Sequence, residues 1–265
     1  MSTVLAGIDG SPTSRAVLDV AREVARVLDA DVDVVHVIEG DTRPPEIEIL
    51  GALTPLRSLR GDVSSVLIAE ASSERVAAIV VGSCGAVGGP TPAGHVSLDV
   101  IGNVPKPVVV VPPTTRPDYE LHTVLVPIQG KPARALEGIV RLAANPELHV
   151  VLLRLLDESS IPAFEDQPYY DVQAWADEFL ARWVPGAPSD TAVEVRIGDP
   201  QDLVVSVTEE VCADLVAIGR RRDVPTAAAP IVLAALDRSP VPVVLFPLAH
   251  RSRDVVASHD VDPVA

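Results

Sequence analysis

The chain has 265 residues, of which 48% are hydrophobic and 22% charged, a composition typical of a folded protein. Asp and Glu number 37 against 21 Lys and Arg, so the formal net charge is −16. Because an acidic protein repels phosphate backbones and anionic lipids, this charge argues against nucleic acids and membrane surfaces as partners. Two cysteines, an N-terminus unlike a signal peptide and no apolar run of the ~18 residues that a membrane span needs predict a cytoplasmic protein.

Strands and helices alternate along the first part of the chain. Short apolar runs predict strands at 4–8, 32–37, 56–59, 79–81 and 108–111. Between them, apolar spacing predicts helices beginning at Pro12 (with Ser11 as the capping residue), over 63–71 and beginning over 96–101. Continuous Val and Ile runs separated by helices indicate a parallel sheet that is covered on both faces. The expected fold is α/β and doubly wound.

Three short matches recur in the same order further along. Residues 3–12 (TVLAGIDGSP) match 123–132 (TVLVPIQGKP), Gly61-Asp62 matches Gly198-Asp199, and 105–112 (PKPVVVVP) matches 240–247 (PVPVVLFP). We therefore predict a tandem of two related domains, each with a five-stranded parallel sheet. The predicted boundaries are 1–113 and 120–248, with a linker at 114–119 and a flexible tail at 249–265.

The offset between matching residues rises from 120 to 137 between the second and third strands. In the second half, residues 169–183 carry apolar side chains at helical spacing. The same connection in the first half is only residues 39–52. We predict that the first domain lacks most of one crossover helix.

A glycine-rich segment follows the strand at 79–81. Its glycines are Gly82, Gly85, Gly88, Gly89 and Gly94, and a predicted helix begins just after them. Glycine lets backbone amides approach an anion, and a helix start offers unpaired N–H groups at the positive end of its dipole. This pattern predicts a phosphate site with Ser97, or less directly Ser83, as a hydroxyl donor. A flexible loop before an ordinary helix explains the segment equally well. Neither a P-loop nor a dinucleotide fingerprint is present.

With the residues Gly7-Ile8-Asp9-Gly10-Ser11, Gly82-Ser83-Cys84-Gly85 and Gly94-His95-Val96-Ser97, the sequence resembles the tandem universal stress proteins. The resemblance implies binding of ATP with magnesium in the N-terminal half only. Asp9 would meet the adenosine moiety, the backbone of Val37 would meet adenine, and the later glycines with Val96 and Ser97 would hold ribose and phosphates. The candidate site is Gly7, Asp9, Val37, Gly82, Ser83, Gly85, Gly94, His95, Val96 and Ser97.

The first half departs from the family pattern at three points. Eight residues separate Gly85 from Gly94 where the family has nine, His95 stands where it has Ser or Thr, and the loop holds no Lys or Arg. His95 and a divalent metal would then share the phosphate charge. In the second half, Gln129 and Arg222 replace Asp9 and Gly85, so we expect no nucleotide there. Residues 220–222, all Arg, are interpreted as a solvated basic turn.

The function predicted from the residues and the resemblance is a nucleotide-linked regulatory switch in the stress response. No nucleophile–base constellation and no metal-ligand spacing is found, so we expect at most slow ATP hydrolysis or autophosphorylation. The alternative is a nucleotide-free scaffold for an unknown protein partner, with both sites degenerate. A third reading is a relative with the same sheet plan, such as an electron-transfer flavoprotein subunit or an ATP-pyrophosphatase. We further expect the two apolar last strands to pair within the chain, with homodimerisation as a further step.

Overall fold

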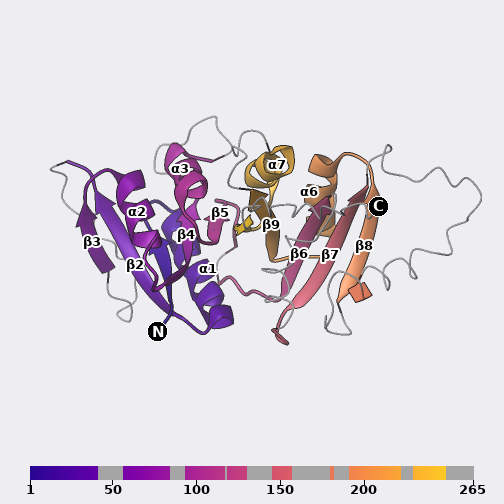
Figure 1. Ribbon diagram of the computed structural model, residues 1–265, viewed down its shortest axis with the longest axis horizontal. Helices are drawn as coiled ribbons and strands as arrows, with labels where there is room; N and C mark the ends of the chain where they lie inside the picture. Colours follow the sequence, from indigo (N-terminus) through magenta and orange to yellow (C-terminus); the bar gives the residue numbers. More distant parts are fainter. Residues whose placement is uncertain are drawn as a thin grey trace, which may run out of the picture.

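The computed structural model describes residues 1–40, 56–83, 93–116, 118–129, 145–156, 180–181, 191–221 and 229–248. Its strands form one 10-stranded sheet in the order β3-β2-β1-β4-β5-β10-β9-β6-β7-β8. The sheet runs the length of the molecule, with β3 at one end and β8 at the other (Figure 1). The order of the first five strands is mirrored by that of the last five, so the predicted tandem is confirmed.

The first half contributes five strands and three helices among the described residues. They are β1 (Thr3–Gly7), α1 (Thr13–Leu28), β2 (Asp31–Ile38), β3 (Leu56–Arg60), α2 (Val63–Ala71), β4 (Val76–Gly82), α3 (His95–Asn103) and β5 (Val108–Val111). Neighbouring strands in this half pair parallel, as predicted. Strand β4 begins earlier than predicted because Val76 and Ala78 already pair with β1.

The second half repeats the plan. Its described elements are β6 (Thr123–Gln129), β7 (His149–Leu156), β8 (Ala192–Ile197), α6 (Pro200–Glu210), β9 (Leu215–Arg221), α7 (Pro230–Arg238) and β10 (Val243–Leu248). These strands also pair parallel. The predicted loss of a crossover helix rests on residues 39–52 and 169–183, which lie outside the described residues apart from Glu39, Gly40, Leu180 and Ala181.

The two halves meet where β5 pairs antiparallel with β10. Val110 faces Val243, Val109 faces Val244 and Val108 faces Leu245, and all of these side chains are buried. This confirms the predicted pairing of the last strands within one chain. Because the pair is antiparallel, the carboxyl ends of the strands in the two halves lie at opposite edges of the sheet. Each half therefore has its own carboxyl edge, which is where ligands bind in doubly wound folds.

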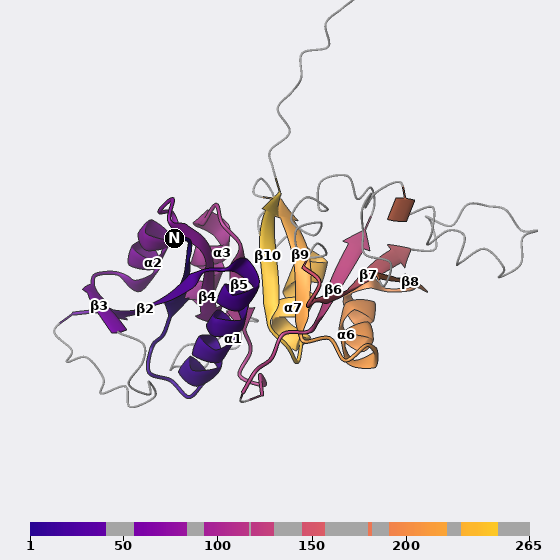
Figure 2. The same ribbon diagram turned by 90° about the horizontal axis from the view of Figure 1, so that it is seen from below.

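Helices cover both faces of the sheet. In the first half, α1 lies on one face, and α2 and α3 lie on the other (Figure 2). The end of α1 is also tied to the start of the second half: Arg26 donates to the Leu121 carbonyl (3.1 Å), and Glu23 accepts from the Leu121 N–H (3.2 Å). No helix in the described part of the chain is long and apolar enough to cross a membrane.

Candidate functional site

A cavity of about 330 Å³ lies at the carboxyl edge of the first half, a volume at the lower end of the range for small-molecule sites. It is bounded by the ends of β1, β2 and β4 and by the first residues of α1, α2 and α3. Eight of the ten candidate residues line it: Gly7, Asp9, Val37, Gly82, Gly94, His95, Val96 and Ser97. Ser83 is buried next to Gly82 without lining the cavity, and Gly85 lies outside the described residues.

The turn between β1 and α1 holds Asp9 in place. Its Oδ1 accepts hydrogen bonds from the Ser11 N–H (2.9 Å) and from the Ser14 hydroxyl (3.1 Å), and the Ser14 oxygen accepts from the Gly10 N–H (3.0 Å). The prediction that Ser11 caps the helix was wrong: α1 begins at Thr13, Pro12 is the capping residue, and no side chain caps it. Sequence reasoning missed Ser14, whose hydroxyl joins the Asp9 side chain to the Gly10 backbone and so fixes the turn.

The start of α3 forms another wall. Its capping residue is Gly94, and no side chain accepts a hydrogen bond from its first N–H groups. The first helical hydrogen bond joins the Leu98 N–H to the Gly94 carbonyl (3.1 Å), so the N–H groups of the preceding turn lie before the helical ladder. The Ser97 hydroxyl donates to the Gly82 carbonyl (2.6 Å), which fastens α3 to the end of β4. In this conformation the Ser97 proton is engaged within the protein.

Apolar side chains make up most of the remaining wall: Val17, Val35, Val37, Val63, Leu67 and Val81. Gly7 belongs to this packed region. A Cβ at Gly7 would lie 3.3 Å from Leu67 Cδ2 and 3.4 Å from Val81 Cγ1, so a side chain there would crowd the wall. The cavity thus combines an apolar wall with polar groups at its edges, which is the usual make-up of a small-molecule site.

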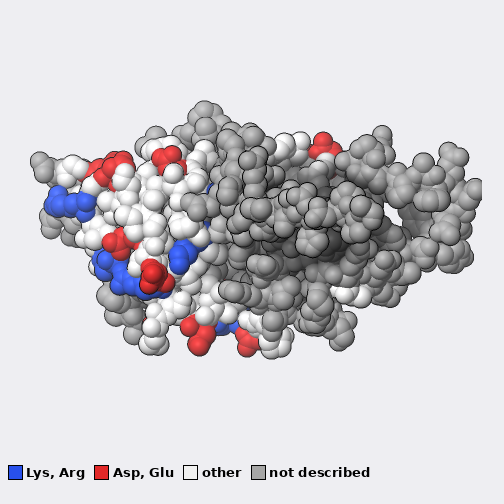
Figure 3. All heavy atoms as spheres, in the orientation of Figure 1, with Lys and Arg blue, Asp and Glu red and all other residues white. Residues whose placement is uncertain are grey.

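Positive side chains are scarce around the cavity. Among the described lining residues, Asp9 is the only carboxylate and the exposed His95 is the only basic side chain. Asp62, which caps α2, has its pKa lowered by hydrogen bonds from the Ser65 hydroxyl and N–H. On the face shown in Figure 3, charged groups of both signs are interspersed among uncharged atoms across the first half. An anion in the cavity would therefore depend on helix N–H groups.

The corresponding edge of the second half is built differently. Gly219 matches Gly82, but the next residue, Arg220, is only 4% exposed and donates to the Val104 carbonyl of the first half (3.3 Å). Its interpretation as part of a solvated turn was wrong, because its side chain lies between the halves. Arg222 lies outside the described residues. Gln129, at the end of β6, takes the place of Asp9.

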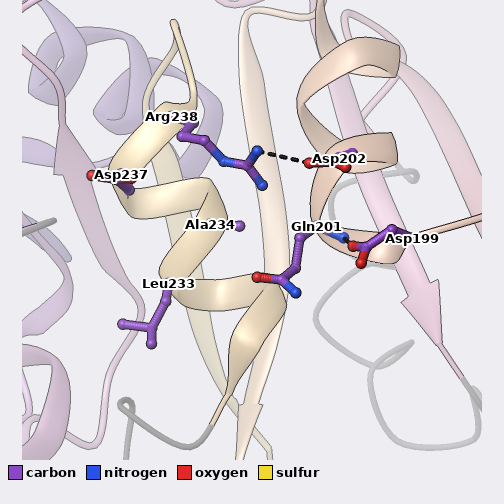
Figure 4. A pocket seen from close by; sticks show the side chains of 7 residues that line it. All are labelled: Asp199, Gln201, Asp202, Leu233, Ala234, Asp237 and Arg238. Carbon is purple, nitrogen blue, oxygen red and sulfur yellow. Dashed lines mark hydrogen bonds and ion pairs between the residues drawn. The ribbon is translucent and has the colours of Figure 1, made fainter.

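A second pocket lies between α6 and α7 (Figure 4). It is lined by Asp199, Gln201, Asp202, Leu233, Ala234, Asp237 and Arg238. The Arg238 guanidinium reaches across it to Asp202 (2.8 Å), while Asp199 accepts the Gln201 N–H (2.7 Å) as the cap of α6. Arg238, Asp202 and Asp199 are thus already engaged within the protein, so the first-half cavity is the better candidate for a ligand site.

Comparison with known proteins identifies the family. The model of the universal stress protein family matches residues 1–55 and 120–247. The chain belongs to the universal stress protein family. The matched stretches leave out 56–119, which contains the glycine-rich part of the candidate site.

Two solved structures share the fold over nearly the whole chain. A universal stress protein from Archaeoglobus fulgidus DSM 4304 is 19% identical, with a TM-score of 0.66 over 92% of this chain and 98% of that one. A functionally unknown protein from Pseudomonas aeruginosa PAO1 is 14% identical, with a TM-score of 0.65 over 94% of this chain and 93% of that one. A shorter universal stress protein from Archaeoglobus fulgidus, solved in complex with dAMP, is 20% identical and covers 48% of this chain and 98% of its own, with a TM-score of 0.32. No curated protein sequence matches the chain.

Proposed function

We propose that the first half of this universal stress protein binds an adenine nucleotide in its cavity and serves as a nucleotide-linked regulatory switch. The main support for the proposal is the position of the candidate residues in the structure. Eight candidate residues from separate segments of the sequence line one cavity, at the sheet edge where doubly wound folds bind ligands.

The wall chemistry suits the parts of a nucleotide. The apolar side chains of Val17, Val35 and Val37 would pack on the base, and the Asp9 carboxylate would accept hydrogen bonds from ribose hydroxyls. Phosphate would lie at the uncapped start of α3, where N–H groups and the helix dipole favour an anion. Bound nucleotide would then connect the starts of α1, α2 and α3. The shape of the surface that these helices form would depend on the bound nucleotide. An unidentified protein partner or a second copy of the chain would bind to that surface.

The specific ligand we propose is ATP with magnesium. The described residues hold no group of three His, Cys, Asp or Glu side chains that could bind a metal. Magnesium would accordingly arrive on the phosphates, as it commonly does in nucleotide sites. The second half would bind no nucleotide in this manner, because Gln129 replaces Asp9 and the Arg220 side chain donates a hydrogen bond to the Val104 carbonyl of the first half. The expected stoichiometry is one nucleotide per chain.

A nucleotide-free scaffold is the second candidate. The observation that favours it is the lack of Lys and Arg among the described lining residues. In that case the cavity would be inherited from the fold, and the protein would act through its surface alone.

Calorimetric titration of the full chain with adenosine, AMP and magnesium ATP tests the proposal. We compare the protein with Asp9→Ala and with Gln129→Ala, a matched control because both residues are exposed at the end of the first strand of their half. Binding with 1:1 stoichiometry is expected, about tenfold weaker in Asp9→Ala and unchanged in Gln129→Ala. If none of the three ligands binds at millimolar concentration, the scaffold is the correct function.

A further inference from the structure

We infer that strand β8, at the outer edge of the second half, binds β8 of a second copy of this chain. β8 is the last strand of the described sheet and pairs on its inner side with β7 (Figure 1). A strand at the edge of a sheet is a template for another strand. The two halves of the chain already meet edge to edge in this way, where β5 pairs antiparallel with β10.

The backbone direction of β8 determines which residues a new strand would meet. The Gly198 N–H donates to the Leu156 carbonyl of β7 (3.2 Å). Because successive residues of a strand turn their N–H and C=O groups to opposite sides, the even-numbered residues of β8 bond toward β7. The odd-numbered residues Val193, Val195 and Ile197 therefore turn theirs toward the open edge. Ile197 is 57% exposed, which is unusual for a large apolar side chain in this structure.

A two-fold axis at Val195 joins these groups to an antiparallel β8 of the second copy. Val195 then faces Val195, and Val193 faces Ile197, so that each pair exchanges both of its N–H···O bonds. The same register places Glu194 opposite Arg196 in a non-hydrogen-bonded pair, in which the side chains of the two strands lie closest. Opposite charges stabilise such a pair, and the two-fold axis forms it twice.

Charge selects this register over its neighbours. An axis at Glu194 would place two Glu194 side chains opposite each other, and an axis at Arg196 would do the same with two arginines, which is destabilising. Within one chain, Arg196 binds Glu194 (2.6 Å) and Glu210 (3.3 Å), and it also donates to the Val195 carbonyl on the open side (3.3 Å). A second β8 replaces this last contact with a backbone hydrogen bond and leaves no charge unpaired.

The opposite end of the sheet lacks this complementarity. Strand β3 carries Arg57 and Arg60 and no acidic residue. Arg57 is held by Asp33 (2.8 Å) and Glu70 (2.7 Å) of its own chain. Two copies of β3 would therefore oppose only positive charges, and charged side chains of one sign protect an edge from pairing. Pairing at β8 alone gives a closed dimer and not a filament.

Sedimentation velocity of the full chain, from about 1 µM to about 500 µM, tests the inference. We expect a reversible dimer with a dissociation constant on the order of 10–100 µM, because a six-residue strand makes a small interface. Glu194→Arg should weaken it at least about tenfold by opposing Arg196, and Glu194→Arg combined with Arg196→Glu should restore it. Arg60→Glu, an exposed charge reversal on β3, is the control and should change nothing.

Cysteine cross-linking tests the register independently, in a chain whose Cys84 and Cys212 are replaced by Ser. Val195→Cys would place two Cα atoms about 5.5 Å apart across the axis, within the range of a disulfide. Val193→Cys would place them about 13 Å apart, which is too far. Oxidation should therefore yield a covalent dimer of the first variant only.

Three outcomes would overturn the inference. The first is a chain that stays monomeric over the whole concentration range. The second is a dimer that Glu194→Arg leaves unchanged, which would place the contact elsewhere on the molecule. The third is equal cross-linking of the two cysteine variants, which would contradict the register.

Discussion

Ser14 offers a test of how the first half positions Asp9. Its side chain is 1% exposed, and its hydroxyl both donates to Asp9 Oδ1 (3.1 Å) and accepts from the Gly10 N–H (3.0 Å). Replacing Ser14 with Ala removes both hydrogen bonds and leaves the fold of α1 otherwise intact, because alanine is a strong helix former. We expect Ser14→Ala to weaken both the turn and the nucleotide site that the turn supports.

The size of the effect follows from the two lost bonds. Each hydrogen bond contributes about 0.5–1.5 kcal/mol net, and the Asp9 and Gly10 ends of these bonds are exposed to water. The free energy of unfolding should therefore fall by about 1–2 kcal/mol, which is roughly 3–6 °C in melting temperature for a protein of this size. Asp9 would keep its bond from the Ser11 N–H, so nucleotide affinity should fall by only about fivefold.

Urea denaturation and calorimetric titration measure the two effects separately. Ser11→Ala is the control in the same turn, since Ser11 also lines the cavity while its hydroxyl makes no hydrogen bond with any described residue. A double-mutant cycle of Ser14→Ala with Asp9→Asn should show coupling between the two side chains. Equal behaviour of Ser14→Ala and Ser11→Ala in stability and affinity would refute the role assigned to Ser14.

Three further predictions concern the fold. Arg220→Ala should lower the free energy of unfolding by about 1–3 kcal/mol in urea titrations, because it removes a buried bond between the halves; the exposed Arg238→Ala should change it by less than about 0.5 kcal/mol. Val244→Lys places an unpaired charge in the buried β5–β10 pair and should lower the free energy of unfolding by about 3 kcal/mol or more in the same assay. A variant as stable as the wild type would contradict the pairing of β5 with β10. Asp62 has a pKa below 3.8 in the folded chain, so its stabilising effect is present above that pH and is lost as the pH falls through the folded value. Between about pH 5 and pH 3 the melting temperature of the wild type should therefore fall more than that of Asp62→Asn.

The local sequence was enough to predict most of the strands and helices. Buried parallel strands must be continuously apolar, and amphipathic helices must repeat their apolar residues at helical spacing, so β5 and α2 were predicted at their observed bounds. The internal repeat predicted the tandem. The apolar character of both last strands, together with the sheet-edge position that the family resemblance implies, predicted their pairing, because exposed apolar edges invite association.

Several candidate site residues could also be named from the sequence, since glycines and helix starts after strands are local signals. What the sequence lacked was the wall that closes the cavity. Leu67 and Val63 come from α2, and their approach to Gly7 depends on how that helix packs across β1. Ser14 was missed for the same reason, because its partner Asp9 meets it only once the turn has folded back.

Arg220 shows the limit most clearly. In the sequence it is one of three adjacent arginines after a strand, a pattern that normally indicates solvent exposure. The antiparallel seam places that strand end beside the end of α3 in the other half, where the Val104 carbonyl accepts a hydrogen bond from the buried guanidinium. Periodicity and composition are properties of neighbouring residues, so the sequence alone determined the elements, their repetition and their buried faces. Which residues from distant segments meet is decided by strand order and strand direction, and these exist only in the tertiary structure.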